Sequence, residues 1–164
     1  MGKYLELICE DNWEYVVRKN CSGVSIVLVY NKSTKKYLVI EQYRIPIKER
    51  ILEFPAGLIE NGETPLDTAL RELREEVGLV TTKERLINLG EVYSSAGLTN
   101  EKAYFYAVIV DKDVNFVNQK LDPMEIKNEL RKFWISEDEL VKSKAAKVLA
   151  ILMRFKYKIK DENI

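Results

Sequence analysis

Apolar residues along the first 42 positions form short runs separated by Asp, Asn, Gly and Ser. Runs rich in Val, Ile, Leu and Tyr between such turn-forming residues are typical of β-strands. The third run, from Val24 to Val29, is apolar almost throughout and predicts a central strand that is covered on both faces. Four strands are expected in this part of the chain, at residues 4–8, 13–18, 23–30 and 36–42.

The hydrophobic pattern becomes helical after residue 64. Thr64 suits an N-cap, Pro65 suits the first helical position, and Gly78 suits a left-handed C-terminal residue. At about 100° per residue, five apolar side chains fall on one face and are expected to pack into the core. They are Leu66, Ala69, Leu70, Leu73 and Val77. Further strands are predicted at residues 86–93, 103–110 and 130–135.

A second capping pattern, Ser136 to Glu139, opens a C-terminal helical region. Its predicted core-facing stripe consists of Ala145, Val148, Leu149 and Leu152. The order of strands, helix, strands and helix predicts an α+β fold, an α/β/α sandwich around a mixed β-sheet, with residues 1–164 in one domain. The strands within residues 1–20 form a small separate pair, whose apolar face could be covered by a second copy of the chain.

The composition restricts the chemistry that the chain can perform. Twenty-six Lys and Arg residues balance 26 Asp and Glu residues, so no net field attracts nucleic acid or an anionic membrane, and no apolar run could span a bilayer. There is no histidine, which excludes Ser-His and Cys-His triads. Cys9 and Cys21 lack metal-ligand spacing, and without a signal sequence we expect a cytoplasmic protein with reduced thiols.

Three carboxylates share a polar face of the helix that follows Thr64. Glu72, Glu75 and Glu76 repel one another there and oppose the helix dipole, so a positive charge should offset them. Arg71 and Arg74 could do so as surface ion pairs, whereas a divalent cation such as Mg²⁺ would do so in a metal site. The helix alone leaves both interpretations open.

The residues around these carboxylates favour the metal site. The pattern Gly-x5-Glu-x7-Arg-Glu-U-x-Glu-Glu-x-Gly-U, with U aliphatic, is the Nudix box. The chain matches it at Gly57, Glu63, Arg71, Glu72, Leu73, Glu75, Glu76, Gly78 and Leu79. It therefore resembles the Nudix hydrolases, enzymes that cut phosphoanhydride bonds.

This resemblance implies roles for the residues of the box. Glu72, Glu75 and Glu76 are expected to bind Mg²⁺, with Mn²⁺ as a substitute and the backbone carbonyl of Ala56 as a further ligand. Arg71 is expected to support these catalytic glutamates by bracing the loop against the helix. The remaining positions of the box with a structural role are Gly57, Glu63 and Gly78.

The flanking segments resemble one branch of the family, the ADP-ribose pyrophosphatases. Residues 41–44, 52–60 and 95–101 are similar to the segments around the box in those enzymes. Ala96 stands where these enzymes usually have proline, and alanine leaves the backbone of the loop freer. Other ADP-sugars or nucleoside diphosphate sugars therefore stay open as substrates.

Residues 13–18 resemble a segment that stacks the nucleobase and contacts phosphate in dimeric members of the family. The resemblance therefore implies a homodimer, with Trp13 against adenine and with Arg18 and Arg44 on the diphosphate. The expected substrate-binding residues are Trp13, Glu14, Arg18, Arg44, Gly97 and Leu98.

The proton of the attacking water needs an acceptor other than histidine, and a carboxylate is the available choice. ADP-ribose pyrophosphatases carry a catalytic glutamate on a mobile loop before a strand. Glu129 aligns best with it by its distance to residues 133–135, and Glu125 is second. Both glutamates could also be solvated loop charges.

The leading hypothesis is Mg²⁺-dependent hydrolysis of the diphosphate bond of ADP-ribose, or of a related ADP-sugar, to AMP and a sugar phosphate. The expected partner is thus a small nucleotide sugar. Two alternatives stay open. The protein could hydrolyse another nucleoside diphosphate sugar or a nucleoside triphosphate, or it could bind ADP-ribose without catalysis.

Overall fold

A mixed β-sheet forms the centre of the molecule in the computed structural model, which describes residues 2–111, 114 and 116–162. The strand order is β5-β4-β3-β8-β7, with β6 also paired to β3 and β9 to β4. Strands β3 and β8 are parallel and the other pairs are antiparallel, so the predicted mixed sheet is confirmed. The strands are β3 (Val24–Asn31), β4 (Lys36–Arg44), β5 (Glu49–Glu53), β6 (Ala56–Leu58), β7 (Ile87–Tyr93), β8 (Lys102–Val110) and β9 (Arg131–Ile135).

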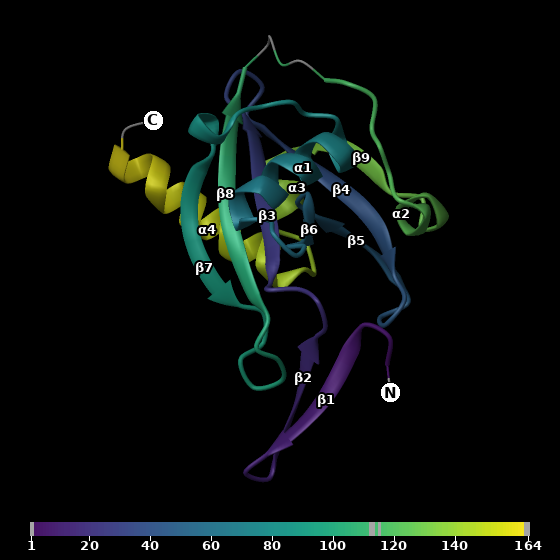
Figure 1. The fold of residues 1–164 in the computed structure, drawn as a ribbon. Coiled ribbons are helices and arrows are strands. Elements are labelled where there is room, and N and C mark those ends of the chain that lie inside the picture. The colour runs from purple at the N-terminus through teal and green to yellow at the C-terminus, as the bar shows by residue number, and fades with distance from the viewer. Residues whose placement is uncertain (1, 112–113, 115, 163–164) are drawn as a thin grey trace.

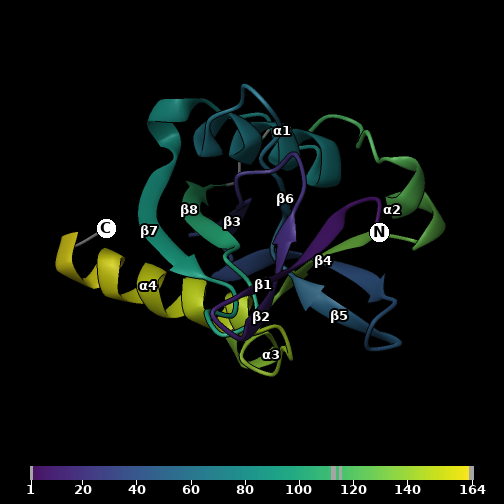
Figure 2. The same cartoon turned by 60° about the horizontal axis from the view of Figure 1, so that its bottom comes forward.

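Helices cover both faces of this sheet. Figure 2 shows α1 (Pro65–Val77) on one side and α4 (Ala146–Glu162) with α3 (Glu137–Leu140) on the other, which confirms the α/β/α sandwich. The short helix α2 (Pro123–Lys127) lies at the side of the molecule, and a 3₁₀ turn, η1 (Lys83–Arg85), follows α1. In the described part of the chain, no helix is long and apolar enough to cross a membrane.

The two faces of β3 explain its continuous apolar run. Val27 and Val29 belong to the cluster that packs beneath α1, together with Leu73. Ile26 and Leu28 belong to the cluster beneath α4. Because successive side chains of a strand point to opposite faces, a strand between two helical layers needs apolar residues at every position.

The predicted core-facing stripe of the C-terminal helix is wrong at Leu149, whose exposed fraction is 42%. The buried residues of α4 are Val148, Ile151, Leu152 and Phe155. They lie three and four residues apart on one face, and Leu149 lies about 100° around the helix from Val148. The helical region is also divided, because α3 ends at Leu140 and α4 begins at Ala146.

The first two strands, β1 (Leu5–Glu10) and β2 (Trp13–Arg18), form a separate antiparallel hairpin, as predicted. In Figure 1 this hairpin projects from the body of the molecule. It contacts the β7–β8 loop, where the Val16 N–H donates to the Leu98 carbonyl at 2.8 Å. Leu7 and Trp13 are 65% and 62% exposed, so the hairpin leaves apolar side chains uncovered within one chain.

Candidate active site

Helix α1 is fixed at both ends by the residues that the sequence singles out. Thr64 and Asp67 form a reciprocal capping box at the N-terminus, and Gly78 has a φ of 74° at the C-terminus. Gly57 lies where β6 passes α1, and a Cβ atom at this position would overlap the Glu72 carboxylate. A side chain at residue 57 would therefore displace Glu72.

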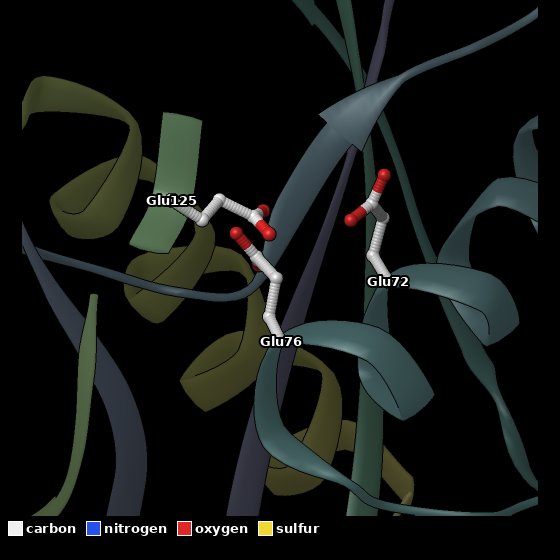
Figure 3. A group of neighbouring side chains, drawn as sticks. All are labelled: Glu72, Glu76 and Glu125. Carbon is white, nitrogen blue, oxygen red and sulfur yellow. The ribbon is translucent and has the colours of Figure 1, made fainter. Parts of the chain in front are cut away.

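Three carboxylates meet between α1 and α2. Glu72 and Glu76 of α1 are 6% and 2% exposed, and Glu125 comes from α2. One oxygen of each lies within 4.8 Å of the others. Figure 3 shows the Glu76 and Glu125 carboxylates pointing toward one another, with Glu72 one turn away. The Ala56 N–H donates to Glu76 Oε2 at 2.8 Å, so β6 forms a wall of this carboxylate cluster.

The environment of the carboxylate cluster disfavours three negative charges. Burial raises the pKa of Glu72 to about 7, and Arg71 partly offsets this effect. Burial also raises the pKa of Glu76 well above its usual range, and the neighbouring Glu72 and Glu125 carboxylates add to the rise. A buried set of oxygen donors with repelling charges suits a hard divalent cation.

Arg71 ties the loop after β6 to α1. Its Nε donates to Glu63 Oε1 at 2.8 Å, and its Nη2 donates to the Leu58 carbonyl at 3.1 Å. Its Nη1 donates to Glu72 Oε1 at 2.6 Å and to Glu75 Oε2 at 3.2 Å. Glu75 is thus paired with Arg71 and lies outside the carboxylate cluster.

The structure brings Glu125 into the carboxylate cluster, whereas Glu129, which its distance to residues 133–135 favours, lies outside the cluster. Glu129 is 64% exposed and pairs with Arg131 at 2.9 Å and with Arg50 at 3.9 Å. The segment before β9 forms the capped helix α2, which carries Glu125 to the α1 glutamates. Asp122 is the N-cap of this helix, and its N–H donates to Glu125 Oε2 at 2.6 Å.

Two neighbouring pockets share β6 as a wall. One, of about 340 Å³, surrounds the carboxylate cluster. The other, of about 240 Å³, is lined by Arg18, Arg44 and Lys147 among others, and we call it the arginine pocket. Arg44 and β6 line both pockets, so the structure brings Arg44 to the carboxylates, whereas Arg18 lines the arginine pocket alone.

Trp13 lines a different pocket from the carboxylate cluster. Its Nε1 donates to the Gly97 carbonyl at 3.3 Å, and it lines a pocket of about 470 Å³ with Tyr15, Tyr93 and Ala96. Figure 1 shows the tip of the hairpin and the β7–β8 loop at the opposite end of the molecule from α1. Glu14 and Leu98 are exposed beside this pocket. Within one chain, the predicted substrate-binding residues thus fall into two groups.

Comparison with known proteins now identifies the family. The sequence model of the NUDIX domain family matches residues 19–154 of the chain. The chain belongs to the Nudix family. This confirms the resemblance inferred from the box that contains Gly57, Glu63 and the α1 glutamates.

Several Nudix proteins are similar to the chain. An ADP-ribose pyrophosphatase from Bacillus subtilis is 33% identical over 147 residues, which cover 85% of this chain and 69% of that protein. A putative Nudix hydrolase from Caenorhabditis elegans is 41% identical over 98 residues, 59% of this chain and 44% of that protein. The chain therefore spans less than half the length of the worm relative.

A solved structure supports the fold. The crystal structure of an ADP compounds hydrolase superimposes with a TM-score of 0.69 at 17% identity and covers 98% of this chain and 94% of that one. The Nudix sandwich is therefore confirmed across nearly the whole chain.

Proposed function

We propose that this Nudix protein is a Mg²⁺-dependent pyrophosphohydrolase that converts ADP-ribose, or a related ADP-sugar, to AMP and a sugar phosphate. The observation that carries the proposal is the cluster of the buried Glu72 and Glu76 with the half-buried Glu125, beside a pocket lined by two arginines. Relatives named ADP-ribose pyrophosphatase in Bacillus subtilis and Saccharomyces cerevisiae, and ADP-sugar pyrophosphatase in Mus musculus, support this substrate class.

The carboxylate cluster would hold the cation. Glu72, Glu76 and Glu125 offer the carboxylate oxygens, Ala56 offers a backbone oxygen, and Glu75 lies beside them on α1. Mn²⁺ could replace Mg²⁺ because both prefer oxygen ligands. When bound, the cation would lower the pKa of the attacking water and offset the charge of the diphosphate.

The remaining steps would use side chains of this protein. Arg18 and Arg44 would bind the diphosphate through charge-assisted hydrogen bonds. Glu125 would orient the attacking water or accept its proton, because it is the candidate glutamate that lies in the carboxylate cluster. Its position supports it over Glu129 for this role.

The nucleobase would stack on Trp13 of a second copy of the chain. The tip of the hairpin and α1 lie at opposite ends of the molecule (Figure 1). Trp13 begins β2 at that tip and Glu72 and Glu76 belong to α1, so a single copy would not bring both to one ADP-sugar. A homodimer in which the hairpin of one protomer reaches its partner would complete the site. The apolar residues exposed on the hairpin support this arrangement.

A substrate panel tests the proposed reaction. The protein would be incubated with ADP-ribose, other ADP-sugars, UDP- and GDP-sugars and nucleoside triphosphates, each with Mg²⁺ or Mn²⁺, and the products separated. We expect AMP and a sugar phosphate from an ADP-sugar. Preference for triphosphates would contradict this substrate class, and tight ADP-ribose binding without any product would indicate a binding module.

Substitution of a cluster glutamate tests the assignment of the cation site. Glu76→Gln should lower kcat by more than about 100-fold, because it removes a charged ligand from the carboxylate cluster. Glu84→Gln, an exposed residue of η1, is the matched control and should keep wild-type kcat. Near-native turnover of Glu76→Gln at saturating Mg²⁺ would show that the site is assigned wrongly.

A further inference from the structure

Two charged residues outside the Nudix box meet at the rim of the arginine pocket. Glu101 directly precedes β8, and Lys147 lies in the first turn of α4. The Glu101 carboxylate is 10% exposed and accepts hydrogen bonds from Arg18 Nε, from Ser94 Oγ at 2.7 Å and from Lys147 Nζ at 3.4 Å. One carboxylate therefore joins the hairpin, the β7–β8 loop and the C-terminal helix.

Both arginines of this pocket are held in the same way. Arg18 donates through Nε to Glu101, and Arg44 donates through Nε to Glu53 at 2.7 Å. Among the described residues, the terminal nitrogens of these two guanidinium groups have no hydrogen-bond partner. A guanidinium fixed through Nε presents its two terminal nitrogens in a set direction, which is the geometry that binds phosphate oxygens in pairs.

The charge balance around Glu101 favours an anion. Burial raises the pKa of Glu101, but the hydrogen bonds from Arg18 and Ser94 lower it below its ordinary value, so the carboxylate is ionised at neutral pH. A single negative charge is thus contacted by two positive ones, Arg18 and Lys147. Lys147 remains 34% exposed and lines the pocket, so its ammonium group is accessible to a ligand.

We propose that Lys147 is a further substrate-binding residue, which contacts a phosphate oxygen of the nucleoside diphosphate sugar, and that Glu101 is a positioning residue that directs Arg18 toward the same diphosphate. This inference rests on the proposed function, because it takes the diphosphate to lie across β6 between the two pockets. Both residues would act on affinity for the diphosphate, and the carboxylate cluster would act on the hydrolytic step.

Kinetics of Lys147 variants test the inference. Lys147→Met keeps the aliphatic stem and removes the charge, so KM for ADP-ribose should rise about tenfold while kcat stays within about twofold. Lys147→Arg should restore most of the affinity. Lys160→Met, on the last turn of the same helix, is the control and should have wild-type KM. An unchanged KM in Lys147→Met, or a loss confined to kcat, would overturn the assignment.

Glu101→Gln tests the positioning role. It should raise KM about fivefold with little change in kcat, because Arg18 keeps its charge but loses the partner that orients it. Thermal melting of each variant verifies that the fold is retained. A fall in kcat equal to the change in kcat/KM would contradict a role in binding.

Calorimetric titration with ADP-ribose in EDTA separates this inference from the proposed function. We expect wild-type protein to bind ADP-ribose about tenfold more tightly than Lys147→Met does, a difference of about 1.4 kcal/mol. If the wild type binds but hydrolyses no substrate in the panel, the proposed function fails while this difference still supports Lys147. Equal affinities, or no binding by the wild type, would overturn the inference.

Discussion

Glu125 and Glu129 are four residues apart and have opposite surroundings. Burial raises the pKa of Glu125, which belongs to the carboxylate cluster. Glu129 is exposed and paired with Arg131. The same substitution at these two positions should therefore have very different consequences for catalysis.

We expect Glu125→Gln to lower kcat about 100-fold, the scale of a lost general base or a misplaced water. Glu129→Gln should stay within about threefold of wild type, because its carboxylate lies on the surface. Steady-state kinetics on the preferred substrate, with both variants at saturating Mg²⁺, make the comparison. If Glu129→Gln lowered kcat more than Glu125→Gln did, the segment before β9 would rearrange when substrate binds. Glu129 would then be the group that accepts the proton of the attacking water.

The residues of the Nudix box were predictable because their chemistry depends on local spacing. Glu72 and Glu76 lie one helical turn apart, so any sequence that forms α1 places them together. Glu125 was identified only as a second choice, since its place depends on how the segment before β9 folds against α1. Glu101 and Lys147 were missed, because residues 46 positions apart become neighbours only through the packing of α4.

At the scale of elements, α1 is anchored at its C-terminus as well as at its N-terminal cap. Carbonyl groups in the last turn of a helix lack partners within the helix. Here Lys120 N–H donates to the Glu75 carbonyl, the Gln119 amide to that of Glu76, and Lys132 Nζ to that of Val77. Two of these donors belong to the segment that leads to α2. The same contacts therefore complete α1 and help place Glu125 over it.

The N-terminal cap of α1 should make stability depend on pH. Lys83 and Thr64 donate to the Asp67 carboxylate and lower its pKa from 3.8 to about 2. A lowered pKa in the folded state gives stability that is present above pH 3.8 and is lost as the pH falls toward about 2. Asp67→Asn should therefore be less stable than wild type at neutral pH, and the difference should shrink over that range.

Urea unfolding followed by circular dichroism at pH 7 and at several acidic values measures this effect. Asp138→Asn is the control, because Asp138 is an exposed residue of the first turn of α3. Its stability should follow that of the wild type at every pH. A constant difference between Asp67→Asn and wild type across the acid range would contradict the assignment.

Most strands and helix α1 could be predicted from the sequence, whereas strands β5 and β6 and helix α2 could not. Strands β3 and β8 and helix α1 have continuous patterns of burial that tertiary contacts reinforce. Strand β6 has three residues and exists because Ala56 pairs with Ile26 of β3, which is a contact that no local pattern contains. The five-residue helix α2 likewise has no local pattern that predicts it, since an isolated segment of this length does not form a stable helix.

At the scale of the whole molecule, the hairpin is a projecting element that keeps large apolar side chains exposed in a single chain. The pairing of Leu7 with Val16 and of Glu10 with Trp13 places Leu7 and Trp13 on opposite faces of the hairpin. Both faces therefore carry a large exposed apolar residue. In a dimer, the partner chain would cover the apolar residue on one face of the hairpin. The apolar residue on the other face would bind a nucleobase.

We expect the protein to be a dimer in solution, with Leu7→Asp shifting it toward monomer and raising KM for the preferred ADP-sugar at least fivefold. Light scattering after size-exclusion chromatography gives the mass, and kinetics at several protein concentrations give KM. Leu149→Asp, which changes an exposed leucine on α4, is the matched control and should stay dimeric. A wild-type monomer with full activity would contradict the two-chain site.

The carboxylate cluster also has a consequence for folding. Three acids held within 4.8 Å, two of them buried, oppose the folded state, and a bound cation would remove most of that opposition. Glu76→Gln should therefore melt a few degrees above wild type in EDTA, although it is expected to be inactive. Mg²⁺ should raise the Tm of wild type more than that of the variant. The carboxylate cluster would then lower the stability of the protein without its cation, and the concentration of divalent cations in the cell would help determine the folded fraction.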